Sequence, residues 1–307
     1  MMRMLLLRAL LLAAPACAVS PAPTVEIAPG VMLPYVAMGT GSGQHGNVSN
    51  ATALWLGSSA GVAIDTSIIY KDEPAIASGI AAIGAARASF FLETKVVTKD
   101  FMRFDGHASV AAEIAYNLEA LGSTPYVDLL LLHFPGSETA NAEAWAALEA
   151  ALAANQTRSI GVSNFNASQL AALKKTAKVW PPAVNQLELS ISYHDDDALA
   201  YNKAEGIHVQ AYSPLCGGFA GSSCTAHGGK NVLTVPEVIA AAKTYGVSGA
   251  QIGLKWVVQR GFPLATSIWK LEYMDEDLSL WGFTITDADM KVLDAVYRPA
   301  HGKSPTY

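Results

Sequence analysis

Four ionisable side chains stand at the ends of apolar stretches of the sequence. Asp65 closes one such stretch and Tyr70 follows it by five residues, while Lys95 and His133 close two more. Short apolar stretches bounded by small or polar residues are typical of buried strands. If these strands are parallel, their C-terminal ends meet at one edge, so we predict that the four side chains form a single site. A carboxylate, a phenol, an ammonium and an imidazole held together are suited to transferring protons.

The chain around these residues alternates strand-like and helix-like segments. A short pair of strands comes first, at 24–27 and 31–33, with Pro29-Gly30 between them as a hairpin turn. Further strands are predicted at 36–40, 61–65, 90–94, 127–132, 158–162, 183–186, 207–211 and 263–266. Helices are predicted at 51–58, 73–86, 109–121, 142–153, 167–175, 195–203, 235–245, 250–259, near 275 and at 287–297.

This alternation predicts an α/β fold. Eight strand–helix units in about 260 residues match a (β/α)8 TIM barrel, and we expect the N-terminal β-hairpin to cover the bottom of the barrel. A doubly wound open sheet is the alternative, but Gly39, Gly41 and Gly43 lack the G-x-G-x-x-G spacing that usually follows its first strand. No linker or internal repeat interrupts the chain, so we predict a single domain over 24–307.

Composition excludes several classes of protein. Hydrophobic residues make up 51% of the 307 residues and charged residues 15%, so a large core is easily built and wholesale disorder is excluded. The net charge of -6, with no cluster of lysine and arginine, argues against nucleic acid as a partner. Charged residues recur throughout the chain after residue 18, so we predict no membrane span there.

Residues 1–18 have the pattern of a secretory signal peptide. Arg3 and Arg8 flank an apolar run of leucine and alanine, the small residues at 16–18 fit a cleavage site, and the first acidic residue is Glu26. We therefore expect a protein of the secretory pathway or the extracellular space. A transit peptide to a plastid or another organelle is the alternative, because Arg8 interrupts the apolar region.

Two further features bear on the compartment. Sequons of the type N-x-S/T predict a glycoprotein, and they occur at Asn47, Asn50, Asn155 and Asn166. Removal of the leader would leave two cysteines, which lie in a loop rich in glycine and serine: Cys216 and Cys224. They either form a disulfide that staples this loop or remain two free thiols.

Six short motifs resemble those of the aldo-keto reductases. They occur in the family's order at the ends of predicted strands: Asp65 with Tyr70, Thr94-Lys95, Leu132-His133-Phe134-Pro135, Ile160-Gly161-Val162-Ser163-Asn164-Phe165, Asn185-Gln186 and Ala211-Tyr212-Ser213-Pro214-Leu215. The resemblance runs from about Val31 to Leu293. Each motif alone is common, but together they are specific. The resemblance implies an NAD(P)H-dependent oxidoreductase that reduces an aldehyde or a ketone.

The resemblance also implies a catalytic tetrad of Asp65, Tyr70, Lys95 and His133. Reducing a carbonyl takes a hydride at carbon and a proton at oxygen, and Tyr70 would be the general acid. The ordinary pKa of a phenol is about 10, and a neighbouring ammonium favours the phenolate. We therefore expect Lys95 to lower the pKa of Tyr70, Asp65 to hold Lys95 in place, and His133 to hydrogen-bond the carbonyl oxygen.

The cofactor contacts implied by the resemblance lie mostly on later loops. Ser163, Asn164 and Gln186 match residues that hold the carboxamide of the nicotinamide, for which they offer donors and acceptors. Tyr212 matches the aromatic residue that stacks on the nicotinamide ring. The other expected contacts are Gly39, Thr40 and Asp65, then Ser213 and Leu215 near the pyrophosphate, and finally Ser267, Lys270, Glu276 and Asp277.

The choice between NADPH and NADH depends on the loop after the eighth strand. Many family members bind the 2′-phosphate of NADP there with a lysine-serine pair and an arginine. At the aligned positions this chain has Ser267 in place of the lysine and Tyr273 in place of the arginine, so both positive charges are missing. Glu276 and Asp277 are expected at the helix start beside the adenine, and carboxylates repel a phosphate. Unless Lys270 compensates, we expect weak discrimination or a preference for NADH.

The sequence leaves the carbonyl substrate open. Gly41 stands where the family usually has an aromatic residue, so we expect a wider or differently walled pocket. We expect the protein to be a monomer. Two other functions are alternatives to carbonyl reduction. A non-catalytic nicotinamide-binding or regulatory protein of the same fold would not need Lys95 beside Tyr70. A secreted glycosidase would need a close pair of carboxylates, and Asp65 has no second acid on a shared motif.

Overall fold

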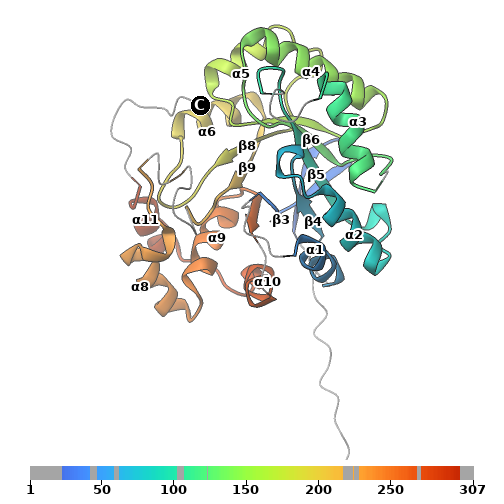
Figure 1. The fold of residues 1–307 in the computed structure, drawn as a ribbon. Coiled ribbons are helices and arrows are strands. Elements are labelled where there is room, and N and C mark those ends of the chain that lie inside the picture. Colours follow the sequence, from blue (N-terminus) through green and yellow to red (C-terminus); the bar gives the residue numbers. More distant parts are fainter. Residues whose placement is uncertain are drawn as a thin grey trace, which may run out of the picture.

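The computed structural model describes residues 23–41, 47–58, 62–101, 107–122, 124–216, 224, 228–267 and 271–297 (Figure 1). The predicted leader at 1–18 and the predicted cofactor contact Lys270 lie outside these ranges. Among the described residues, no helix is both long and apolar enough to cross a membrane.

Eight parallel strands of the described residues close into a barrel, as predicted. Neighbours in the sequence pair with one another, and the last strand pairs with the first over four residue positions, from Leu264 with Val36 to Ser267 with Gly39. The strands are β3 (Val36–Gly39), β4 (Ala63–Asp65), β5 (Phe91–Val96), β6 (Leu129–Leu132), β7 (Ile160–Ser163), β8 (Val184–Glu188), β9 (His208–Tyr212) and β10 (Leu264–Ser267).

Helices surround this barrel (Figure 1). They are α1 (Val48–Gly57), α2 (Glu73–Ile83), α3 (Val110–Ala120), α4 (Glu138–Ala153), α5 (Ala167–Lys174), α6 (Asp196–Glu205), α8 (Pro236–Tyr245), α9 (Gly249–Gln259), α10 (Leu271–Leu278) and α11 (Asp287–Asp294). The predicted start of α4 was four residues too late. Its first turn is polar and lacks apolar periodicity, and the Ser137 side chain caps it by accepting from the Ala140 backbone N–H at 3.3 Å.

The predicted N-terminal hairpin is confirmed. It consists of β1 (Thr24–Ala28) and β2 (Val31–Pro34), and Gly30 in its turn has a φ of +72°, which favours glycine. The guanidinium of Arg158 donates to the Gly30 carbonyl at 3.0 Å and so attaches the turn to the barrel.

The hairpin also covers the bottom of the barrel, as expected. Its buried side chains form one apolar cluster with residues that mostly begin barrel strands, and the members are Ile27, Val31, Leu33, Ala37, Ala63, Phe91, Leu129, Leu131, Val184 and Ala265. Since strands begin at this end, the opposite end carries their C-terminal residues. The bottom is therefore closed by apolar packing, and the predicted site lies at the open top.

A second apolar layer lies between the strands and the helices. It contains three fully buried tryptophans, one each from α1, α4 and α9: Trp55, Trp145 and Trp256. The indole N–H of Trp55 donates to the Ala63 carbonyl at 2.7 Å and fixes α1 beside the first residue of β4. This layer holds the strand carrying Asp65 rigidly, which is what a site assembled from separate strands requires.

Candidate active site

The four predicted catalytic side chains meet at the top of the barrel. Asp65 ends β4, Lys95 lies in β5, and His133 directly follows β6. The ammonium of Lys95 donates to Asp65 Oδ1 and, at 3.1 Å, to the Thr66 carbonyl. The hydroxyl of Tyr70 lies 3.4 Å from His133 Nε2, and Lys95 Nζ lies 5.6 Å from the centre of the Tyr70 ring.

A tight turn places Tyr70 in this group. Residues Ile68–Tyr70 form one turn of 3₁₀ helix, closed by a hydrogen bond from the Tyr70 N–H to the Ser67 carbonyl at 2.9 Å. Lys71 then adopts a left-handed conformation with a φ of 59°, which redirects the chain towards α2. The hydroxyl of Thr66 donates to Asp72 at 2.7 Å and braces both ends of the turn.

Gly41 lies directly against the phenol of Tyr70. A Cβ atom at residue 41 would lie 2.6 Å from Tyr70 Cζ and 2.7 Å from its hydroxyl oxygen. The Tyr70 ring thus occupies the space next to the glycine. An aromatic residue cannot take position 41 while Tyr70 keeps this place.

The balance of charge and burial sets the protonation states of the tetrad. Burial is the largest single effect on Lys95 and lowers its pKa, but Asp65, Tyr70 and Glu93 together outweigh it, so the pKa is raised and the ammonium stays charged. Burial raises the pKa of Tyr70 to about 12, although Lys95 opposes this shift. Lys95 does lower the pKa of Tyr70, as expected, but the net shift is upward, because burial together with the negative charges of Asp65, Asp72 and Glu93 exceeds the effect of the ammonium. Tyr70 thus holds its proton at neutral pH.

His133 is neutral at physiological pH. Its pKa is lowered well below the ordinary value, first by burial and then by the positive charge of Lys95. The Phe134 ring stacks on the imidazole with a centroid distance of 4.2 Å. Whereas Nε2 lies near the Tyr70 hydroxyl, the other ring nitrogen, Nδ1, lies 2.7 Å from the hydroxyl of Ser67. Sequence reasoning did not identify Ser67 as part of this group.

A second carboxyl, Glu93, lies beneath the tetrad and was also missed. It is fully buried, and its Oε1 accepts from the side-chain amides of Gln186 at 3.2 Å and Gln210 at 2.8 Å. Burial, followed by the nearby charge of Asp65, raises its pKa well above the ordinary value. The sequence signal was present: Glu93 is two residues before Lys95, and alternate strand residues face the same side.

Several predicted cofactor contacts form a continuous hydrogen-bonded set at the ends of β7, β8 and β9. The Tyr212 hydroxyl donates to Asn164 Oδ1 at 2.8 Å, and the Asn164 amide donates to the His133 carbonyl at 2.9 Å. The Ser163 hydroxyl donates to the Gln186 carbonyl at 2.9 Å. The Gln186 amide also donates to Asp65 Oδ1 at 3.2 Å. These residues are therefore contiguous with the tetrad.

The contacts predicted near the first and last strands also adjoin the tetrad. Gly39 pairs with Asp65 on one side and with Ser267 on the other. The Thr40 hydroxyl donates to the Asp65 carbonyl at 3.3 Å. Ser213, which follows Tyr212, has a left-handed φ of 49°.

Two of the remaining predicted contacts, Leu215 and Glu276, touch α9 or the residue that caps it. Leu215 lies beside Gly253, since a Cβ there would approach its Cδ2 to 2.8 Å. Glu276 Oε2 accepts from the hydroxyl of Ser248, the residue that caps α9, at 2.6 Å. Asp277 is buried, and burial raises its pKa well above the ordinary value.

The predicted place of Glu276 and Asp277 at a helix start is wrong. They lie in the second half of α10, which begins at Leu271. The reason is that Met274 and Leu278, spaced four apart, pack into the core and require helix on both sides of Met274. The two carboxyl groups are thus placed by the packing of α10 rather than at its N-terminus.

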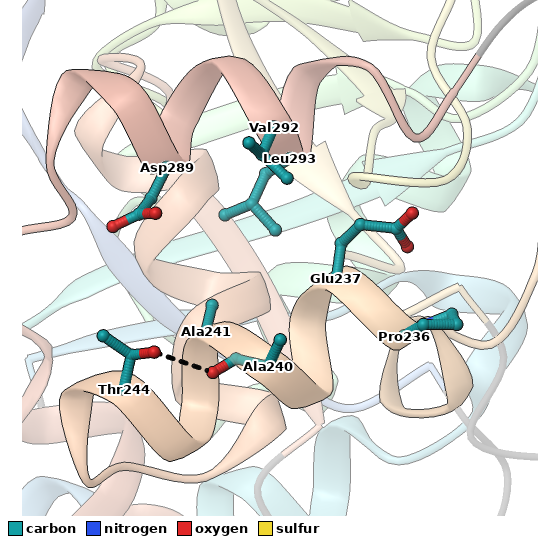
Figure 2. A pocket seen from close by; sticks show the side chains of 8 residues that line it. All are labelled: Pro236, Glu237, Ala240, Ala241, Thr244, Asp289, Val292 and Leu293. Carbon is teal, nitrogen blue, oxygen red and sulfur yellow. Dashed lines mark hydrogen bonds between the residues drawn. The ribbon is translucent and has the colours of Figure 1, made fainter.

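Other parts of the described structure offer little competing chemistry. Over the residues that are placed, no group of three or more histidine, cysteine, aspartate or glutamate side chains could hold a metal ion. A hollow of about 310 Å³ lies between α8 and α11 (Figure 2). Its walls are Pro236, Glu237, Ala240, Ala241, Thr244, Asp289, Val292 and Leu293, none of which belongs to the tetrad or the cofactor contacts.

The chain resembles known oxidoreductases over most of its length. Residues 49–298 match the profile of the Aldo/keto reductase family. Morphine 6-dehydrogenase of Pseudomonas putida is 32% identical over 274 residues, 89% of this chain and 90% of that protein. Glyoxal reductase of Bacillus subtilis is 30% identical over 273 residues, 89% and 92%. The crystal structure of a Bombyx mori aldo-keto reductase in complex with NADP superposes with a TM-score of 0.78 at 26% identity, covering 91% of this chain and 94% of that one.

Proposed function

The chain belongs to the aldo-keto reductase family, and from this premise we propose that it reduces an aldehyde or a ketone with a nicotinamide cofactor and Tyr70 as general acid. The observation that carries this proposal is the position of Tyr70: its hydroxyl lies 3.4 Å from His133 Nε2, and the buried Lys95 ammonium lies 5.6 Å from the centre of its ring. A protonated phenol beside a neutral imidazole and near a fixed cation is ready to give its proton to a carbonyl oxygen.

The residues at the ends of β7, β8 and β9 fit a nicotinamide. Ser163, Asn164 and Gln186 bring hydroxyl and amide groups together at one place, and Tyr212 adds a half-buried aromatic ring that is hydrogen-bonded to Asn164. A carboxamide requires both donors and acceptors, which this set contains. When bound, the cofactor supplies the hydride that reaches the carbonyl carbon.

Each member of the tetrad then has one task. Tyr70 gives its proton to the carbonyl oxygen. Lys95 stabilises the phenolate that is left, since among its neighbours the ammonium is the one that lowers the pKa of Tyr70. Asp65 holds the ammonium through a buried ion pair. Neutral His133 offers a hydrogen bond to the same oxygen and sets the direction of the carbonyl.

Replacement of Tyr70 tests this assignment. Tyr70→Phe keeps the ring that packs on Gly41 and removes only the hydroxyl. We expect turnover of a simple aldehyde to fall by roughly 10²–10⁴, the usual range for one acid-base group. Binding of NADPH, followed by the change in its fluorescence, should be unaltered. Near-full aldehyde reduction by this variant would exclude Tyr70 as the acid.

A non-catalytic nicotinamide-binding or regulatory protein is the second candidate. It predicts NADPH fluorescence on binding but no turnover of any aldehyde or ketone by the wild-type protein. The tetrad argues against it, because a binding protein has no need of a buried Lys95–Asp65 pair beside Tyr70. A cost of several kcal/mol for burying an ion is hard to explain without a catalytic use.

We propose weak discrimination between NADPH and NADH, or a preference for NADH. Tyr273, in the first half of α10, replaces the expected arginine at this register. Charged hydrogen bonds contribute about 1.5–3 kcal/mol each, so loss of the cationic contacts should weaken NADP binding. Comparison of kcat/KM for both cofactors decides this. A preference for NADPH above roughly a hundredfold, about 2.7 kcal/mol, would contradict it.

We also propose that the mature protein is a monomer in a secretory or extracellular compartment, with a plastid or another organelle as the alternative. The support for the compartment is the leader pattern at 1–18 and the sequons. Asn155 is exposed and open to modification, whereas the side chain of Asn166 is occupied as the cap of α5. N-terminal sequencing and glycosidase treatment of protein purified from its source would test both points, and a retained leader would contradict the proposal.

A further inference from the structure

We propose that Ser67 is a positioning residue, which holds His133 in the tautomer that carries its proton on Nε2 and so turns an N–H towards the substrate oxygen. This inference rests on the proposed function. It concerns a hydroxyl that stands outside the tetrad but contacts it directly. The carrying observation is the 2.7 Å distance between Ser67 Oγ and His133 Nδ1.

Ser67 is held rigidly in this position. It lies two residues after the end of β4. Its side chain is fully buried, and its backbone is extended, with φ -162° and ψ 145°. Its carbonyl accepts from the Tyr70 N–H at 2.9 Å, so the same residue anchors the turn that carries the phenol. The backbone of Ser67 therefore cannot shift away from the imidazole without disturbing Tyr70.

The hydrogen bond from Ser67 can run in two directions. A neutral imidazole has one N–H and one bare nitrogen. If Nδ1 carried the proton, it would donate to Ser67 Oγ, and the serine's own proton would be left with the Lys95 carbonyl at 3.5 Å. That distance is at the outer limit for a hydrogen bond. If Nδ1 is bare, the serine proton lies in the 2.7 Å contact instead.

The second arrangement also suits the reaction. With Nδ1 bare, Nε2 carries the proton on the side where the Tyr70 hydroxyl lies at 3.4 Å. A carbonyl oxygen placed there would meet two donors. With Nε2 bare, the imidazole would instead accept from Tyr70 and compete with the substrate for its proton. Besides Ser67, the groups that face the His133 ring are the hydroxyl of Tyr70, the positive charge of Lys95 and the ring of Phe134.

The test begins with the tautomer itself. Nitrogen-15 spectra of the histidine side chains in the full-length protein, without substrate, report which ring nitrogen carries the proton. The chain has seven histidines, so the His133 signals are assigned by their loss in His133→Asn. We expect the Nε2–H form in the wild-type protein and a mixture or the Nδ1–H form in Ser67→Ala. An Nδ1–H form in the wild-type protein would overturn the proposal.

Kinetics provide the second readout. Ser67→Ala should lower kcat by about tenfold, since a misdirected hydrogen bond of about 1.4 kcal/mol corresponds to that factor, and should leave NADPH binding unchanged. Ser67→Thr, which restores a hydroxyl, should recover part of kcat and the Nε2–H signal. Unchanged kcat together with an unchanged tautomer in Ser67→Ala would refute the role of Ser67.

A matched control is available. Ser159 is also a buried serine, and its hydroxyl donates to the Asp128 carbonyl at 2.7 Å just before β7, away from the tetrad. Ser159→Ala removes the same atoms and should alter neither the His133 tautomer nor kcat. Because the spectra require no substrate, a wild-type protein that shows Nε2–H but reduces no carbonyl would refute the proposed function and leave the tautomer assignment standing.

Discussion

The contact between Gly41 and Tyr70 gives a sharp prediction for Gly41→Ala. The added Cβ would lie 2.6 Å from Tyr70 Cζ, whereas ordinary contacts begin at 3.4 Å, so the phenol must retreat by 3.4 − 2.6 = 0.8 Å. The backbone at residue 41 imposes no strain, because its φ lies outside the left-handed range. The expected cost therefore falls on the position of the acid rather than on the fold.

The magnitude follows from this displacement. A misplacement of about 1 Å at a reacting group can lower turnover about 10²-fold. For a shift of 0.8 Å we expect kcat to fall by about 10- to 100-fold, which is about 1.4–2.7 kcal/mol in the activation free energy. The urea midpoint of unfolding should change little, because the displaced atoms are the far end of one side chain that is only half-buried.

The assay is a double-mutant cycle on aldehyde reduction. Gly41→Ala should lower kcat in the wild-type background but have almost no further effect in Tyr70→Phe, where the acid is already absent. Gly57→Ala is the control, since a Cβ at the end of α1 meets nothing within 4 Å. If Gly41→Ala kept full turnover, or lowered it equally in both backgrounds, the phenol would not be held where the structure places it.

Three other predictions concern the charge state and the crosslink. Lys95→Met removes the cation that opposes the raised pKa of Tyr70, so turnover should fall and the pH profile should change shape; an unaltered profile with normal turnover would contradict the pair. Burial raises the pKa of Glu73 to about 7, so its neutral form stabilises the fold at acid pH and this contribution is lost as pH rises towards 7. Glu73→Gln should therefore become progressively more stable than wild type between pH 4.5 and 7 in urea unfolding, by at most about 3 kcal/mol, and a constant difference would refute this. The structure joins Cys216 to Cys224, so non-reducing mass analysis should show a protein two hydrogens lighter than the dithiol form, and two alkylatable thiols would exclude the bond.

The barrel and the clustering of Asp65, Tyr70, Lys95 and His133 could be predicted from the sequence because their signals are local. Each strand is a short apolar run, and Asp65, Lys95 and His133 lie at or near the C-terminal ends of such runs. In a parallel barrel these ends all lie at the same opening, so the fold class alone predicts that the three side chains are close together. The hairpin was also predictable, since Pro29-Gly30 separates two apolar segments. In these cases one stretch of sequence contains both the element and its boundary.

What the sequence missed depends on distant packing. Ser67 and His133 are 66 residues apart, and nothing local shows that their side chains touch. Glu93 interrupts an apolar run and has no visible partner in the sequence, although two amides satisfy one of its oxygens. The effect of Lys95 on the pKa of Tyr70 has the predicted sign, but the net shift is upward, since charges can be read from the sequence and burial cannot.

The closure of the barrel has a consequence for the order in which the chain folds. β3 pairs with β10, its partner from the other end of the chain, and the apolar floor under the hairpin includes Ala265 from that last strand. During synthesis, Leu33 and Ile27 emerge long before Ala265 exists. The nascent chain therefore exposes apolar, aggregation-prone surface until β10 has been synthesised and paired, because non-local pairing is slow. Efficient production of this protein should depend on chaperone capacity more than the stability of the finished barrel suggests.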